Sequence, residues 1–122
     1  MAGEGNKVWI FPDLEMPPAG DSLLKGHESV IILNLNDKPV DVKISLYFED
    51  KDPITGINVK VDANRVRCIR TNNIADFDGV KIEQELQYAM KLECDLPIVA
   101  QYGRLDTRQD NAAFYTVMGY SC

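Results

Sequence analysis

Apolar and polar residues alternate along much of this chain, as they do in β-strands that have one buried face. Every second residue from Val40 to Phe48 is apolar. The alternation recurs over residues 57–61 and 85–94, and in the second segment it fits a period of two better than a helical period. A period of two predicts strands that place one face on a core and the other in water.

Two further segments, Ser29 to Leu35 and Pro97 to Tyr102, are apolar on both faces. They predict central strands that are covered on both sides or lie in a contact between subunits. Three shorter segments complete the pattern, namely an opening strand, a helical turn and a closing strand, at residues 7–11, 108–113 and 114–121. Turn residues separate the strands about every ten residues, and we expect Asn36-Asp37-Lys38-Pro39 to join two of them as a hairpin. This pattern predicts an all-β, antiparallel sandwich or barrel.

Size and charge narrow the possible classes of protein. The 122 residues are enough for one domain, which we expect to span residues 1–122, and the net charge is −6. That sign argues against a nucleic acid or an anionic membrane as the main partner. The longest uninterrupted apolar run, Val30–Leu33, is far shorter than the roughly 20 residues of a membrane span. The N-terminus lacks the features of a secretory signal, so we expect the protein in the cytoplasm.

Groups that could support catalysis are few. His27 is the single histidine, and the chain has neither a phosphate-binding loop nor a nucleophile elbow. The three cysteines are far apart in sequence, which favours free thiols over a disulfide framework or a zinc site. We therefore expect no catalytic residues, no metal site and no cofactor. A small sugar-active enzyme that uses Glu28 and Asp106 as a carboxylate pair near Trp9 is the alternative.

Three parts of the chain could bind a polar ligand. Trp9 offers an aromatic platform, His27 and Glu28 open an apolar strand, and residues 101–109 combine two arginines, an aspartate and two glutamines. Each has a structural alternative: Trp9 as a core residue, His27 as a loop residue beside a strand end, and the 101–109 block as an internal ion-pair network or a subunit contact. A second basic group, Arg65, Arg67 and Arg70, is best explained as a solvated strand face.

The segment Leu96-Pro-Ile-Val-Ala-Gln-Tyr-Gly-Arg-Leu-Asp-Thr-Arg-Gln109 resembles the signature of the sensory rhodopsin transducer family, and His27-Glu-Ser-Val-Ile-Ile-Leu-Asn34 is similar to a second family strand. The resemblance implies a jelly-roll β-sandwich that assembles as a cytoplasmic homotetramer. It also implies a site for a small polar ligand, with sugars as suggested ligands. At the matching positions this site consists of Trp9, His27, Glu28, Gln101, Arg104, Asp106 and Arg108. The chain departs from the family pattern at Tyr102-Gly103 and in the loop that starts at Phe11.

We expect a noncatalytic sensory module that binds a small polar ligand or relays a signal to a protein partner. The family resemblance offers a second hypothesis, a transducer that docks on a retinal-binding membrane photoreceptor. The residues that are apolar on both strand faces also predict a homo-oligomer.

Overall fold

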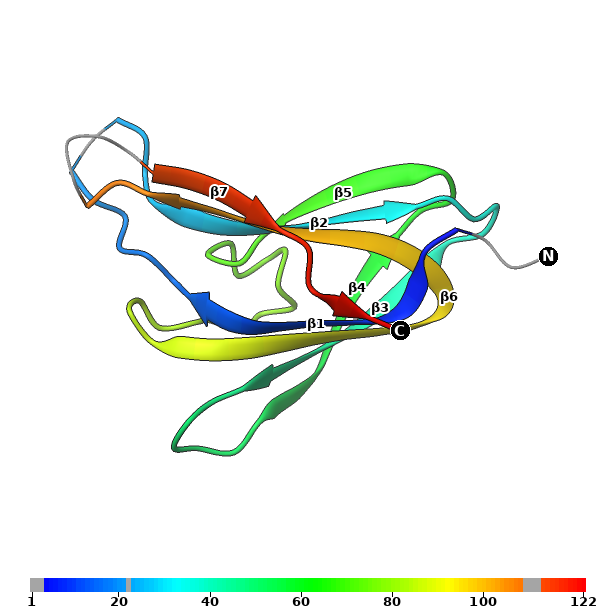
Figure 1. The fold of residues 1–122 in the computed structure, drawn as a ribbon, viewed down its shortest axis with the longest axis horizontal. Coiled ribbons are helices and arrows are strands. Elements are labelled where there is room, and N and C mark those ends of the chain that lie inside the picture. Colours follow the sequence, from blue (N-terminus) through cyan, green and yellow to red (C-terminus); the bar gives the residue numbers. More distant parts are fainter. Residues whose placement is uncertain (1–3, 22, 109–112) are drawn as a thin grey trace.

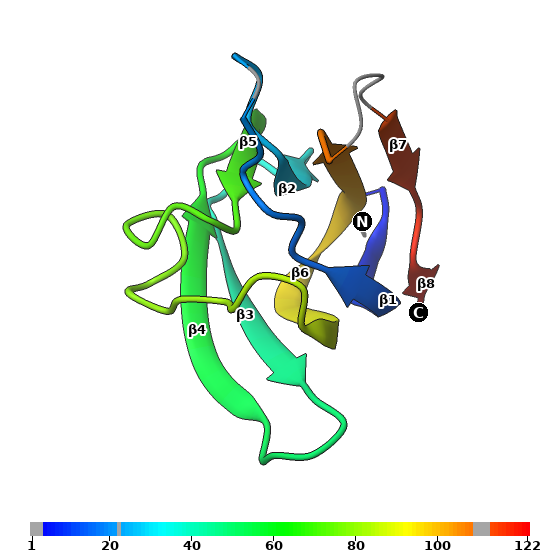
Figure 2. The same ribbon diagram turned by 90° about the vertical axis from the view of Figure 1, so that its left-hand side faces the viewer.

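Two antiparallel sheets packed face to face form the protein (Figure 1; Figure 2). The computed structural model describes residues 4–21, 23–108 and 113–122. The first sheet has the order β4-β3-β6-β1-β8, and the second joins β5, β2, β6 and β7. The strands are β1 (Asn6–Glu15), β2 (His27–Asn34), β3 (Val40–Tyr47), β4 (Ile54–Val61), β5 (Arg65–Arg70), β6 (Gln87–Asp106), β7 (Ala113–Val117) and β8 (Tyr120–Ser121). The predicted all-β sandwich of the jelly-roll type is therefore confirmed.

Alternation along β3 shows how the sequence places the core. Val40, Val42, Ile44 and Leu46 are buried, and the residues between them are exposed or half-buried. Each buried aliphatic side chain contributes about 1.5–3 kcal/mol relative to leaving it exposed. The apolar faces of both sheets meet in one continuous core. No helix among the described residues is long and apolar enough to cross a membrane.

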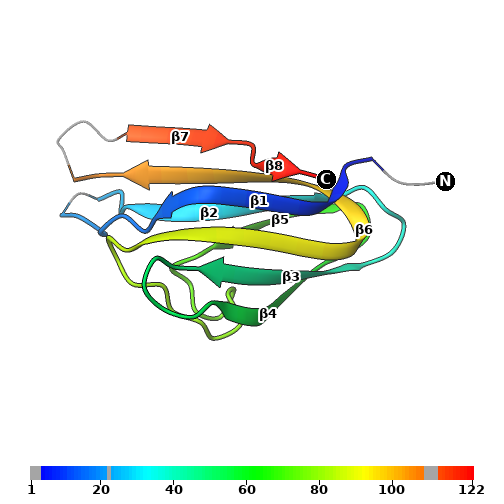
Figure 3. The same cartoon turned by 60° about the horizontal axis from the view of Figure 1, so that its bottom comes forward.

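Strand β6 belongs to both sheets. Its 20 residues pair with β1 and β3 in the first sheet, then turn and pair with β2 and β7 in the second (Figure 3). The sequence predicts two strands here, at 85–94 and 97–102, and the structure joins them into one. The turn lies where pairing with β1 is irregular, between the pairs Val8↔Glu93 and Asn6↔Ile98.

The turn in β6 is fixed by residues from outside the strand. The indole N–H of Trp9 lies 3.1 Å from each of the carbonyl oxygens of Asn6 and Ile98. The amide of Asn36 donates to the carbonyl oxygen of Pro97 over 2.7 Å. These bonds give carbonyl groups at the irregular part of the ladder side-chain donors from outside β6. They hold the two halves of β6 at a fixed angle.

Three predicted connections differ from the structure. The segment Asn36–Pro39 does not close a hairpin, because β2 and β3 lie in different sheets and the segment crosses between them. The predicted closing strand is two strands, β7 and β8, interrupted at Met118 and Gly119. The predicted helical turn at 108–113 falls largely on residues 109–112, outside the described residues, and Ala113 already belongs to β7.

Gly5 is required where the N-terminal segment passes the turn in β6. Its φ is +107°, and a Cβ atom there would lie 2.1 Å from the carbonyl oxygen of Ile98. We expect Gly5→Ala to lower the free energy of unfolding by more than about 2 kcal/mol in urea denaturation, because backbone strain and a backbone clash add. Gly56→Ala is the control: φ is +81° and the added Cβ meets nothing within 4 Å. It should cost only about 1–2 kcal/mol. Equal losses in both variants would contradict this account of the turn.

Candidate functional site

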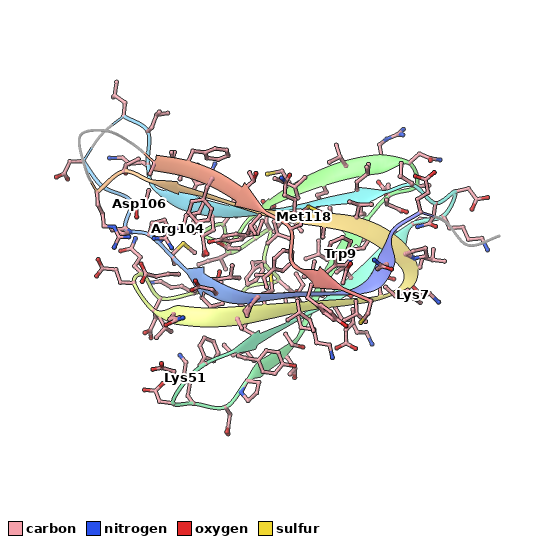
Figure 4. All side chains as sticks on the ribbon, viewed as in Figure 1. Lys7, Trp9, Lys51, Arg104, Asp106 and Met118 are labelled. Carbon is pink, nitrogen blue, oxygen red and sulfur yellow. The ribbon has the colours of Figure 1, made fainter. Side chains whose placement is uncertain are left out.

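Charged side chains from three segments converge at one end of the sandwich. Arg104 and Asp106 lie at the C-terminal end of β6, and Figure 4 shows them side by side there. Asp106 accepts from Arg104 Nη2 over 3.2 Å and from Arg108 Nε over 3.0 and 3.1 Å. Glu15, at the end of β1, lies 3.5 Å from Arg104 and 3.4 Å from Arg108. Glu85 lies 3.8 Å from Arg108. We call these five residues the charged cluster.

The charged cluster pins the ends of β1 and β6 and the segment before β6. Hydrogen bonds from Arg108, followed by those from Arg104, lower the pKa of Asp106 well below its usual range, so this carboxylate is ionised at neutral pH. The Arg104 side chain is 14% exposed and that of Arg108 is 40% exposed. Arg104 therefore mainly holds this end of the sandwich together, whereas the Arg108 side chain is also accessible to a binding partner.

Beneath Arg104 lies a fully buried carboxylate. Glu28 is paired with Arg104 across β2 and β6, so both side chains point into the sandwich. It is 0% exposed. Its Oε1 accepts from Tyr88 over 2.6 Å and from Thr71 over 3.2 Å, and its Oε2 accepts from the hydroxyl of Tyr102. These three hydroxyl groups replace the water that the carboxyl group loses on burial.

Burial dominates the acid–base properties of this network. Loss of solvent raises the pKa of Glu28, and the bonds from Tyr102, Tyr88 and Thr71 offset part of that rise. Burial and the neighbouring Glu28 also raise the pKa of Tyr102 and Tyr88, so both remain hydroxyl donors. A carboxyl group sealed under three hydroxyls has no path to a substrate. The alternative that pairs Glu28 with Asp106 for sugar chemistry therefore gains no support from the geometry.

Trp9, His27 and Gln101 do not join the charged cluster. Trp9 is 4% exposed and pins the turn in β6, six residues along β1 from Glu15 (Figure 4). His27 and Gln101 lie on the outer face of the second sheet, because they alternate with Glu28 and Tyr102 on the inner face. The ring Nδ1 of His27 lies 2.9 Å from the carbonyl oxygen of Lys25. The structure thus divides the seven predicted residues among a core turn, an outer face and the charged cluster with its buried carboxylate.

The three arginines of the second basic group do not share one face of β5. Arg65 is exposed, and Arg67 donates to the carbonyl oxygen of Lys60 and lies 3.9 Å from Asp76. Arg67 and Arg70 are three residues apart on β5, so their side chains lie on opposite faces of the strand. The cysteines are free thiols, and burial raises the pKa of the Cys94 thiol to about 11, which keeps it protonated and unreactive.

A cavity of about 490 Å³ lies beside the charged cluster. Its lining includes Met16 and Gln84, the chain neighbours of Glu15 and Glu85, and the amide of Glu85 donates to the carbonyl oxygen of Met16 over 2.7 Å. Thr71, which donates to Glu28, also lines this cavity. None of the seven residues predicted from the sequence does.

Comparison with known proteins decides the family. The family model described as Anabaena sensory rhodopsin transducer matches residues 4–121. This chain belongs to the sensory rhodopsin transducer family. The family resemblance drawn from the signature segments is confirmed, and the match extends over all eight strands.

Two solved structures of similar fold agree with this assignment. The crystal structure of Thermotoga maritima 1070 has a TM-score of 0.85 and 28% sequence identity, and the match covers 98% of this chain and 97% of that one. The Anabaena sensory rhodopsin transducer has a TM-score of 0.72 and 29% identity, covering 84% of this chain and 97% of that one. A search of the curated proteins found no match to this chain.

Sequence reasoning missed the residues that complete this end of the transducer-family fold. Tyr88, Tyr102 and Thr71 bind Glu28, and Glu15 and Glu85 complete the charged cluster. One signal was present, since Glu28 adjoins an apolar strand and a buried carboxylate requires donors. Tyr102 lies two residues before Arg104, which places both side chains on one face.

The buried carboxylate gives the folded protein a defined pH dependence. Because the pKa of Glu28 is raised on folding, the folded state holds a proton that the unfolded chain releases above about pH 4.5. The free energy of unfolding contributed by this group therefore falls as pH rises from there to the raised pKa, by at most about 1.4 kcal/mol per pH unit. We expect Glu28→Gln to remove that slope in urea denaturation series at several pH values. Exposed Glu49→Gln is the control and should keep it. Parallel profiles for Glu28→Gln and the wild type would contradict the assignment.

Proposed function

We propose that this protein is a noncatalytic signalling adaptor that docks, in the cytoplasm, on a retinal-binding membrane photoreceptor. Membership of the sensory rhodopsin transducer family over residues 4–121 is the observation that carries the proposal. The net charge of −6 supports it, because the cytoplasmic loops of membrane proteins are rich in lysine and arginine. Complementary charge speeds encounter and fixes orientation.

The end of the sandwich that holds the charged cluster has the composition of a docking surface. Leu23 is fully exposed and Leu24 largely so, in the loop whose Ala19 carbonyl accepts from Thr107. Exposed leucines beside charged residues are typical of protein–protein contact sites. Arg108 is the exposed arginine of the charged cluster and can exchange its ion pairs for those of a partner. We therefore assign this end to the photoreceptor and interpret the cluster as an interface, in preference to a sugar pocket.

Docking predicts a measurable complex. A retinal-binding sensory rhodopsin in lipid nanodiscs, taken from the same genome as this chain, should bind the purified protein with a dissociation constant of about 10 μM or tighter in calorimetry. Arg108→Glu combined with Leu23→Ser should weaken binding at least tenfold. The control, Arg65→Glu, reverses a charge at the end of β5 that lies away from the charged cluster, and it should bind like the wild type. Absence of binding, or equal loss in both variants, would refute this docking surface.

We also propose that the protein is a homotetramer assembled through the outer face of the second sheet. Exposed Val66 lies beside Leu33 across β5 and β2, and exposed Phe114 lies beside Leu105 across β7 and β6. Between them, Ile31 is half-buried. Apolar side chains at both ends of this face are unfavourable in water and are covered by association.

Light scattering tests the assembly. The wild type should have about four times the 13.7 kDa mass of the chain at micromolar concentration. Val66→Glu together with Phe114→Glu should shift it to smaller species, because a buried unpaired charge is costly at an interface. Tyr47→Glu, a similar exposed position on β3, should leave the mass unchanged. A wild-type monomer would rule out the tetramer.

A further inference from the structure

The cavity beside the charged cluster has an apolar floor and a polar rim. Met16, Pro17 and Ile82 are buried in its wall, and Gly26 lies against the backbone of Pro18. Its charged lining residues, Lys81 and Glu83, are both exposed. A volume of about 490 Å³ falls within the roughly 300–1,000 Å³ of small-molecule sites. Apolar walls with a few polar groups are typical of such sites.

One polar side chain of the cavity wall, Thr71, already donates its hydroxyl proton to a buried group. Thr71 is 1% exposed, and its hydroxyl donates to Glu28. A hydroxyl that has given away its proton can only accept from a ligand. A ligand group that reaches Thr71 is therefore a hydrogen-bond donor, and an ammonium group is such a donor.

Opposite charges stand at the rim of the same cavity. Lys81 and Glu83 are separated by one residue, and neither has an ion-pair partner among the described residues. The pair suits a ligand that carries both charges, because Lys81 binds a carboxylate and Glu83 binds an ammonium. A neutral sugar would leave both charges unused, and a simple anion would face Glu83.

We propose that this cavity binds a free α-amino acid with an apolar side chain. The side chain lies on Met16, Pro17 and Ile82, the carboxylate pairs with Lys81, and the ammonium lies between Glu83 and Thr71. Neither Arg108 nor Leu23, the residues changed in the docking test, lines this cavity, so its test needs no photoreceptor and either proposal can fail alone. Thr71 separates the ligand from the carboxyl group of Glu28, to which its hydroxyl donates.

Calorimetry with L-phenylalanine and two truncated analogues tests the chemistry. L-phenylalanine should bind with a dissociation constant below about 1 mM. Phenethylamine lacks the carboxylate and 3-phenylpropanoate lacks the amine, and each should bind at least tenfold more weakly. Glucose and glycerol should show no heat of binding. Equal affinity for all three aromatic compounds, or binding of glucose alone, would overturn the proposal.

Matched variants test the location. Lys81→Met and Glu83→Gln change exposed rim residues and should each weaken L-phenylalanine at least tenfold without changing the melting temperature. Lys38→Met, an exposed lysine at the opposite end of the sandwich, should bind like the wild type. Thr71→Val removes the hydroxyl group of the cavity wall and also its bond to Glu28. The affinity of this variant for L-phenylalanine is therefore compared only after circular dichroism shows a native fold. Unchanged binding in both rim variants would overturn the site, whatever the result for Thr71→Val.

Discussion

One buried carboxyl group sets the conditions for the rest of this fold. Glu28 needs donors because burial without them costs several kcal/mol. The donors come from β6 on both sides of its turn, Tyr88 in the first sheet and Tyr102 in the second, and from Thr71 after β5. Two tyrosines 14 residues apart on one strand can meet a single carboxyl group only if that strand turns between them. The turn held by Trp9 and the network at Glu28 are therefore two parts of one constraint.

The same constraint also positions the charged cluster and the cavity. Arg104 lies across from Glu28 and anchors Asp106, and Arg108 extends from Asp106 to the outside. On the other side, Thr71 leads from Glu28 to the wall of the cavity. The charged cluster, the buried carboxyl group and the cavity are thus linked through neighbouring side chains, because Arg104 is paired with Glu28 across the strands and Thr71 donates to Glu28. Contact continuity of this kind permits coupling between sites, which additionally requires two arrangements of the linking element.

Sequence patterns predicted the strands better than their connections. Alternation identified β3, part of β4 and the first half of β6, because half-buried strands leave a period of two. Segments that are apolar on both faces identified β2 and the second half of β6. The continuity of β6 was missed because Pro97 lacks a ladder donor and reads as a break, although here it lies at the turn. The predicted site could have been divided in advance, since adjacent strand residues such as His27 and Glu28 must face opposite ways. Trp9 could not have been placed, because its role depends on a carbonyl 89 residues away.

Exposure explains why the charged residues at this end serve different purposes. Ion pairs of half-exposed residues are worth little, because water and salt compete with them. In the proposed docking, Arg108 would therefore lose little when it exchanges Glu85 for a partner's carboxylate. Arg104 is more buried, and its ion pair with Asp106 is less exposed to water and salt. Specific recognition must come from groups that gain by being covered, and the exposed Leu23 is such a group. In the docking that we propose, charge would accordingly favour approach and orientation, and the apolar contact would supply the affinity.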